Sequence, residues 1–102
     1  MTTQVKTYGF TDKNIGLAPK EHGVYALYKN GEVIYYGRAA GRGVTIASRL
    51  TDHKSGREGP CTASADTYAR EVTTSPVTRE RQLLQAHLDR YGHLPACNNR
   101  MP

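Results

Sequence analysis

Two short apolar runs with a polar link between them begin the patterned part of the chain. Residues 23–28 and 33–36 are rich in the β-branched and aromatic residues that strands prefer. The link between them contains Asn30-Gly31, and this dipeptide between two such runs indicates a β-hairpin. Because both runs are apolar at successive positions, they predict strands that are covered on both faces of a sheet.

Two helices and one further strand are expected after the hairpin. A glycine-rich loop spans 37–43, and the spacing of apolar residues predicts a helix over 44–54. Residues 66–73 alternate as a strand does, after a loop at 55–65. Ser75-Pro76 is typical of a helix start, and Gly92 ends that helix after about Tyr91. The order β-β-α-β-α predicts an α+β fold, with a small central antiparallel sheet of about three strands flanked by helices.

The first residues of the chain show weaker patterning. We interpret residues 1–18 as an N-terminal arm that packs loosely on a domain formed by residues 19–102. Tyr8 and Phe10 are the apolar side chains expected to anchor it.

Size and charge narrow the class of protein. A chain of 102 residues suits one domain. Its formal net charge is +5, and residues 38–57 hold five basic residues against Asp52 alone. A phosphate backbone is the usual partner of such a basic segment, and a solvated basic face without a ligand is the alternative. The basic residues are Arg38, Arg42, Arg49, Lys54 and Arg57.

Composition and targeting signals exclude further classes. No run approaches the ~20 apolar residues of a membrane-spanning helix, and the N-terminus lacks the apolar core of a secretory signal. Cys61 and Cys97 are too few for a disulfide framework, and Cys97 is interpreted as a small packing residue. Together with His87 and His93 they fit no compact zinc motif. We therefore expect a cytoplasmic protein.

Glu80 occupies an unexpected position on the second helix. At 100° per residue it falls in the middle of the apolar stripe, next to Leu84 and Val77. An unpaired carboxylate on a core-facing stripe is costly. Glu80 is therefore either half of a buried salt bridge, with Arg49 as a candidate partner, or a carboxylate at the floor of a pocket that binds a metal or accepts protons.

Together these residues resemble the GIY-YIG nuclease family. Gly23-Val24-Tyr25 matches its first motif, and Tyr35-Tyr36-Gly37 matches its second. Tyr36 departs from the family, which has an aliphatic residue there, and Arg38 stands where lysine is frequent. The loop before Arg49 is also longer, so the helix and His53 favour Arg49 over Arg42. The run from 23 to 39 is similar to the N-terminal nuclease domain of bacterial excision-repair endonucleases. The remaining matches are Arg49 and His53 on the first helix, Glu80 on a later helix, and Asn98 in a P-x-x-N element, with Asn99 as its alternative.

The resemblance implies a catalytic set and a cofactor. Glu80 would hold one divalent cation, Mg²⁺ with Mn²⁺ as a substitute. Tyr25 and Tyr35 would position the attacking water, and Arg49 would stabilise charge on the phosphoryl group. His53 would shuttle a proton or contact phosphate, and Asn98 would orient Glu80 or the loop beside it. The DNA-binding residues would be Arg38, Arg42, Lys54 and Arg57.

The activity implied is metal-dependent hydrolysis of DNA by a bare catalytic module. It would be a monomeric bacterial or phage-encoded endonuclease with weak sequence specificity, acting on single-stranded, branched or non-specific duplex DNA. A catalytically silent DNA-binding module is the alternative, and a small basic protein-interaction domain is a third interpretation.

A shared active site constrains the hairpin. With a two-residue turn at Asn30-Gly31, Tyr25 would face Tyr36, and Tyr25 and Tyr35 would lie on opposite faces of the sheet. With a three-residue loop and a bulge at Gly31, Tyr25 would lie directly opposite Tyr35. The shared site favours the three-residue loop, and Glu80 and Arg49 are expected to border the same pocket as both hydroxyls.

Overall fold

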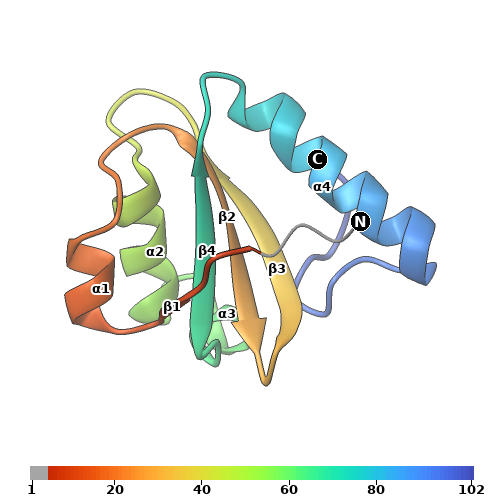
Figure 1. Cartoon of the computed structure of the whole chain (residues 1–102), viewed down its shortest axis with the longest axis horizontal. Helices are drawn as coiled ribbons and strands as arrows, with labels where there is room; N and C mark the ends of the chain where they lie inside the picture. The colour runs from red at the N-terminus through yellow and green to blue at the C-terminus, as the bar shows by residue number, and fades with distance from the viewer. Residues whose placement is uncertain (1–4) are drawn as a thin grey trace.

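A computed structural model describes residues 5–102 and shows one antiparallel sheet with helices on both faces (Figure 1). The strands lie in the order β1-β4-β2-β3. They are β1 (Tyr8–Gly9), β2 (Gly23–Lys29), β3 (Glu32–Ala39) and β4 (Thr67–Val72). The helices are α1 (Asp12–Gly16), α2 (Ile46–Lys54), α3 (Pro60–Ala63) and α4 (Pro76–Tyr91). The α+β class and the order β-β-α-β-α are confirmed, with β1, α1 and α3 as additional elements.

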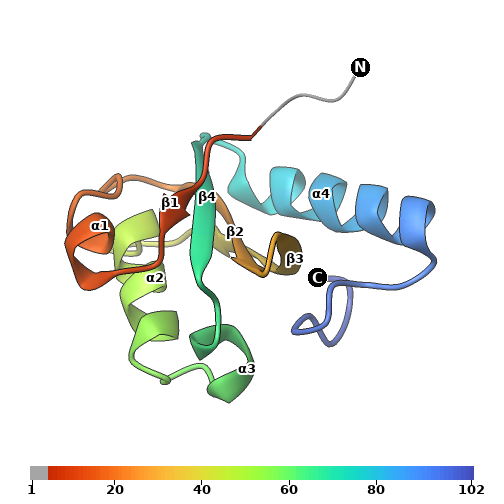
Figure 2. The ribbon, with the colours of Figure 1, turned by 60° about the horizontal axis from the view of Figure 1, so that its bottom comes forward.

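The sheet separates two packed layers (Figure 2). On one face, Tyr25 and Leu27 of β2 join Ile46 and Leu50 of α2 in the main core. On the other face, β2 and β3 contact α4, where Leu84 is buried. Successive residues of β2 therefore serve both layers, which explains its unbroken apolar run. No helix in residues 5–102 has the length and apolar character needed to cross a membrane.

The principal helices follow their local signals closely. Thr45 caps α2, and its side chain and that of Ser48 form a reciprocal capping box, so the helix begins two residues later than expected. Gly92 ends α4 in the left-handed conformation, with φ of 77°. Ser75 precedes Pro76 as expected, but its side chain makes no capping hydrogen bond.

Segments near the N-terminus and before β4 contain structure that the sequence did not indicate. Tyr8 of β1 pairs with Tyr68 of β4, and Phe10 and Ile15 are buried in the main core. Residues 55–65, expected to be a loop, include the short helix α3. These elements have two to five residues, which is too short for a hydrophobic period to become visible.

The β2–β3 hairpin differs from the expectation in its turn. Lys29 pairs with Glu32, so the loop has two residues, Asn30 and Gly31, and both have positive φ (53° and 81°). This is the conformation of a type I′ turn, and the expected three-residue loop is wrong. A β-bulge follows, because Tyr28 pairs with Val33 but Leu27 pairs with Tyr35.

The bulge determines where the two tyrosines lie. One extra residue, Ile34, shifts the register by one position, so that Tyr25 lies opposite Gly37 rather than opposite Tyr36. Tyr25 and Tyr35 therefore share a face as diagonal neighbours, with ring centroids 6.2 Å apart. The shared face is confirmed, whereas direct opposition of the two residues is wrong.

Cys61 and Cys97 form a disulfide, which corrects the interpretation of Cys97 as a small packing residue. The bond joins α3 to the segment after α4, with the two Cα atoms 5.8 Å apart. A separation of 36 residues gives no local sign of pairing. Only the return of the chain from α4 to the edge of β3, where the Cys97 amide donates to the Ile34 carbonyl at 2.7 Å, brings the two sulfur atoms together.

The disulfide is expected to stabilise the folded protein. Closing a 36-residue loop restricts the unfolded chain and stabilises the fold by about 4 kcal/mol in the chain-entropy model. Reduction, or replacement of both cysteines by serine, should therefore lower the free energy of unfolding in urea by roughly that amount. An unchanged urea midpoint after complete reduction, verified by thiol titration, would contradict this expectation.

Candidate active site

A buried line of hydrogen bonds connects the sheet with α2 and α3. The Tyr25 hydroxyl lies 2.8 Å from His53 Nε2, and His53 Nδ1 lies 2.8 Å from the Thr62 hydroxyl. All three side chains are at most 3% exposed. The ring of Tyr35 completes the cluster, with its centroid 5.0 Å from that of His53. The structure thus brings together three residues of the expected catalytic set.

Gly37 makes room for this cluster. A Cβ atom at this position would meet the Tyr25 hydroxyl oxygen at 2.5 Å and Tyr35 Cε2 at 2.7 Å. Such distances lie well inside van der Waals contact, so any side chain at position 37 would displace at least one of the two rings. The glycine of the second motif therefore has a steric reason, which the sequence alone did not reveal.

Burial determines the protonation states in the cluster. It lowers the pKa of His53 to about 4, assisted by the charge of Arg49 and opposed by the charges of Glu58 and Asp52. Burial also raises the pKa of Tyr25 well above its ordinary value, as does the proximity of Tyr35. At neutral pH the imidazole is therefore neutral and the phenol retains its proton.

An open pocket of about 410 Å³ lies beside this cluster, between β3, α2 and α4. Tyr35, Arg49 and Glu80 line it, as the sequence predicts. Tyr25 does not line it, because its side chain is covered and its hydroxyl bonds to His53. The candidate site therefore has an accessible tyrosine in the pocket and a buried tyrosine behind it.

Glu80 is buried to 7% exposure and forms an ion pair with Arg38 rather than Arg49. An Arg38 guanidinium nitrogen donates to Glu80 Oε1 at 2.7 Å. Among the described residues, Glu80 Oε2 has no hydrogen-bond partner, and it is not one of the fully enclosed unpaired atoms. That oxygen is therefore not fully enclosed, and the Glu80 side chain lines the pocket.

Arg49 is held by two other carboxylates. Its guanidinium donates to Asp52 at 3.1 Å and to Glu58 at 2.9 Å. The hydrogen bond to Arg49, together with its charge, lowers the pKa of the Glu58 carboxyl. These contacts hold the positive charge at the pocket wall. Glu58 was not singled out from the sequence, because its partner lies nine residues away on another element.

Asn98 acts on the backbone of β3. Its Oδ1 accepts from the Tyr36 amide, and its Nδ2 donates to the Tyr36 carbonyl, both at 3.0 Å. The side chain thus pairs with the outer edge of β3 as a neighbouring strand would. It fixes the chain next to Tyr35, and it lines a second pocket that also contains Glu80. Asn99 lines that pocket too but makes no such bonds.

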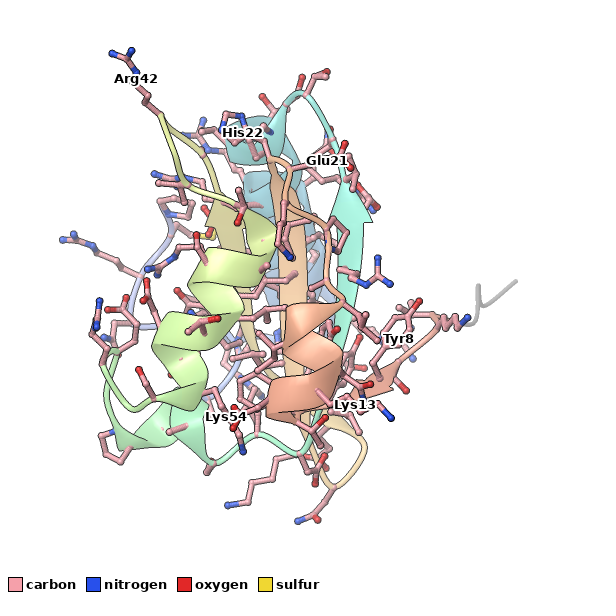
Figure 3. All side chains as sticks on the ribbon, turned by 90° about the vertical axis from the view of Figure 1, so that its left-hand side faces the viewer. Tyr8, Lys13, Glu21, His22, Arg42 and Lys54 are labelled. Carbon is pink, nitrogen blue, oxygen red and sulfur yellow. A yellow bond between two sulfur atoms is a disulfide. The ribbon has the colours of Figure 1, made fainter. Side chains whose placement is uncertain are left out.

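The expected DNA-binding residues do not form one cluster. Arg38 lines the pocket, but it is paired with Glu80. Figure 3 shows Arg42 pointing away from the molecule at one end of α2 and Lys54 near the other end. The ammonium group of Lys54 lies 5.5 Å from the Phe10 ring centroid. Arg57 is exposed and lies 3.5 Å from Asp52.

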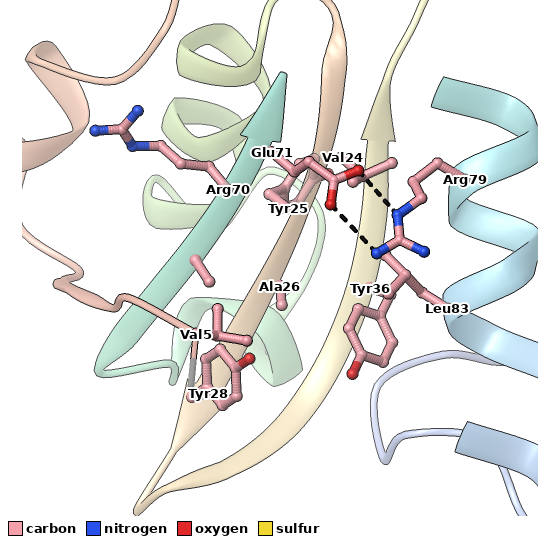
Figure 4. A pocket seen from close by; sticks show the side chains of 11 residues that line it. Val5, Val24, Tyr25, Ala26, Tyr28, Tyr36, Arg70, Glu71, Arg79 and Leu83 are labelled. Carbon is pink, nitrogen blue, oxygen red and sulfur yellow. Dashed lines mark hydrogen bonds and ion pairs between the residues drawn. The ribbon is translucent and has the colours of Figure 1, made fainter. Parts of the chain in front are cut away.

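Neither the hollow under α4 nor the two cysteines provide a second candidate site. A smaller hollow of about 130 Å³ under α4 is largely apolar and is bordered by the ion pair of Glu71 with Arg79 (Figure 4). In the described part of the chain, no cluster of three His, Cys, Asp or Glu side chains forms a metal site. The disulfide also removes Cys61 and Cys97 as zinc ligands.

The donor chemistry of Glu80 suits a hard divalent cation. A carboxylate oxygen that faces an open, water-accessible pocket is the ligand that Mg²⁺ prefers, because Mg²⁺ retains most of its waters and accepts one or two carboxylates. Glu80 Oε2 meets this requirement, while Oε1 is held by Arg38. The residues present therefore fit a divalent cation that is bound to the protein through one carboxylate, that of Glu80.

Solved structures share this fold. The GIY-YIG N-terminal endonuclease domain of UvrC from Thermotoga maritima, bound to magnesium as its catalytic divalent cation, matches with a TM-score of 0.57 and 27% identity, over 85% of this chain and 93% of that one. A variant of that domain with a tyrosine replaced by phenylalanine matches with a TM-score of 0.57 and 28% identity, over 86% of this chain and 93% of that one. A variant with an asparagine replaced by alanine matches with a TM-score of 0.59 and 26% identity, over the same shares. No protein-family model and no curated protein sequence matches the chain.

His53 should make stability depend on pH below its ordinary pKa. Its pKa falls from 6.5 to about 4 on folding, so between these values the unfolded chain binds a proton that the folded protein does not. The contribution is complete above pH 6.5 and is lost as the pH falls towards 4. Urea unfolding across this range should give a steeper loss of stability for the wild type than for His53→Phe. Equal slopes would mean that folding does not lower the pKa of His53.

Proposed function

The chain has the fold and the motif order of the GIY-YIG nucleases, and on that premise we propose that it is a metal-dependent nuclease that cleaves DNA. One observation carries the proposal: Tyr35, Arg49 and Glu80 come from three different elements and line a single pocket. An acceptor for water, a fixed positive charge and a carboxylate for a cation are the groups that phosphodiester hydrolysis needs.

Glu80 is the residue that would hold the cation. A bound divalent cation supplies charge stabilisation at the phosphate and at the leaving oxygen. The related domain from Thermotoga maritima binds its cation in variants that lack one tyrosine hydroxyl or one asparagine side chain. This supports a carboxylate, rather than the tyrosines or the asparagine, as the anchor.

Tyr35 in the pocket wall, backed by the buried Tyr25, would orient the attacking water. The pKa of Tyr35 is raised by burial and by the negative charge of Glu80, so its phenol is neutral at neutral pH. A neutral hydroxyl in the pocket wall can accept a hydrogen bond from water and align it with the phosphorus atom. The charge of Arg49 favours the phenolate forms of both tyrosines, which would assist loss of a proton from that water.

Arg49 would bind the phosphoryl oxygens. Its guanidinium is held by Asp52 and Glu58 before substrate arrives. A preorganised cation stabilises the charge that grows on phosphate without the cost of reorganising solvent. Arg38 lines the same pocket and would serve as a further phosphate contact. Asn98, through the backbone of Tyr36, would keep Tyr35 in register with these groups.

The preferred substrate would be single-stranded, branched or non-specific duplex DNA. Arg42 and Arg57 offer dispersed charges for the phosphate backbone, which favours contacts that do not depend on base sequence. We propose a monomer with weak sequence specificity. Cleavage of matched single-stranded, duplex and branched oligonucleotides in Mg²⁺ would rank these forms.

The location of the enzyme can be read from its cysteines. The cytoplasm expected from the sequence is reducing and would keep Cys61 and Cys97 as thiols, whereas an oxidising compartment would preserve the bond between them. Alkylation of free thiols in protein taken directly from its own cells therefore reports the compartment.

Glu80→Gln should abolish cleavage while the fold is retained. The change preserves size but removes the negative charge that would hold the cation, so both Mg²⁺ affinity by calorimetry and nicking of plasmid DNA should be lost.

Glu71→Gln is the matched control, because Glu71 makes its ion pair with Arg79 beside the hollow under α4. That variant should cleave DNA as the wild type does. Cleavage by Glu80→Gln, or by the wild type in excess chelator, would exclude the assignment of Glu80 to the cation.

Arg49→Ala and Arg57→Ala should differ in kind, although both arginines contact Asp52. Loss of the preorganised charge at Arg49 should lower kcat by about 10²–10³. Arg57 is exposed, so its loss should weaken DNA binding and reduce the dependence of binding on salt. Single-turnover cleavage and salt titrations separate the two effects. Equally mild effects at both positions would mean that Arg49 only contacts the DNA phosphate backbone, as Arg57 does.

A further inference from the structure

Thr62 is a buried polar side chain to which the sequence assigned no role. It is 3% exposed, and its hydroxyl lies 2.8 Å from His53 Nδ1. His53 Nε2 in turn lies 2.8 Å from the Tyr25 hydroxyl. Both nitrogens of one imidazole are therefore used, each by a single hydroxyl group.

A neutral imidazole carries one N–H donor and one bare nitrogen acceptor, so this line of hydrogen bonds can run in only two directions. In one direction, Nδ1–H donates to Thr62 and Nε2 accepts from the Tyr25 hydroxyl. In the other, Thr62 donates to Nδ1, and Nε2–H donates to the Tyr25 oxygen. The two directions differ in where the Tyr25 hydrogen points.

Arg49 favours the first direction. Its guanidinium has donors only, it lies one turn before His53 on α2, and its positive charge acts on the Tyr25 hydroxyl. If Nε2–H donated to the Tyr25 oxygen, His53 would not hold the hydroxyl hydrogen, and that hydrogen would be exposed to the repulsion of the nearby cation. With the hydrogen given to Nε2, the Tyr25 oxygen presents only lone pairs to this positive charge.

We propose that Thr62 is a positioning residue: its hydroxyl accepts from His53 Nδ1–H, so that His53 Nε2 accepts the Tyr25 hydrogen and the Tyr25 oxygen, behind the pocket, acts only as an acceptor. An acceptor directly behind Tyr35 favours loss of a proton from a water in the pocket, whereas a donor opposes it. The inference rests on the proposed nuclease function for its catalytic consequence, but not for the orientation of the imidazole.

The contacts around Thr62 allow the effect of its hydroxyl to be tested separately from the effect of its packing. Its neighbour Cys61 is bound to Cys97, so α3 is held to the segment after α4 without help from the hydroxyl. The Ala65 amide donates to the Thr62 carbonyl at 3.2 Å, and this backbone bond is independent of the side chain. Thr62→Val therefore removes one hydroxyl from a position that other contacts hold.

The first experiment determines the tautomer of His53 by long-range ¹H–¹⁵N NMR of the whole chain at neutral pH, with His53→Phe used for assignment. In the wild type, Nδ1 should carry the proton and Nε2 should be bare. Thr62→Ser should keep this pattern, whereas Thr62→Val should lose it. Protonated Nε2 in the wild type, or an unchanged pattern in Thr62→Val, would overturn the proposal whether or not the protein cleaves DNA.

The second experiment measures cleavage. Thr62→Val should lower kcat by between about 10-fold and 100-fold with KM unchanged, as expected for a misplaced group rather than for weaker binding. Thr62→Ser should restore kcat. Thr51→Val is the matched control, because the Thr51 hydroxyl donates to the Ala47 carbonyl of its own helix, and it should leave kcat unchanged. Equal losses in Thr62→Val and Thr62→Ser would make Thr62 a packing residue only. A wild type with the expected tautomer that fails to cleave DNA would refute the proposed function and leave the positioning of His53 standing.

Discussion

The register of the β2–β3 hairpin is the constraint on which the candidate site depends. Side chains alternate between the faces of a strand, so a shift of one residue in β3 would move Tyr35 to the face covered by α4. The extra residue at Ile34 prevents this, because it places Tyr25 opposite Gly37 and brings both tyrosines to the face of α2. Gly37 then admits the two rings at a distance that no other residue would tolerate.

Around this hairpin, the site separates buried groups from accessible ones. Tyr25, His53 and Thr62 form a nearly dry line behind the pocket, where each polar atom has a protein partner. Arg49 and Glu80 lie at the pocket wall, and each is held by an opposite charge. Buried polar groups are costly unless paired, so this pairing allows the candidate catalytic groups to lie inside so small a core.

The segment after α4 connects these parts. Cys97 donates its amide to Ile34 at the bulge, and Asn98 holds both backbone groups of Tyr36. The same segment is bound through the disulfide to α3, which presents Thr62 to His53. The contacts that hold β3 and those that hold His53 of α2 thus both depend on the segment after α4, which the disulfide fixes in place.

Local sequence was sufficient to predict the principal strands and helices and to identify most of the candidate site residues. Apolar runs, Asn30-Gly31 and Gly92 predicted the principal strands, the hairpin and the end of α4, because these signals act within a few residues. The position of Glu80 on an apolar stripe indicated a buried carboxylate for the same reason. Contacts between distant segments decided the rest. The pairing of Glu80 with Arg38, the union of Cys61 with Cys97, and the bulge whose extra carbonyl is bound by Cys97 each join residues 36 or more positions apart or depend on such a contact. No local pattern encodes these contacts, since they form only when the sheet, α4 and the returning segment have packed together.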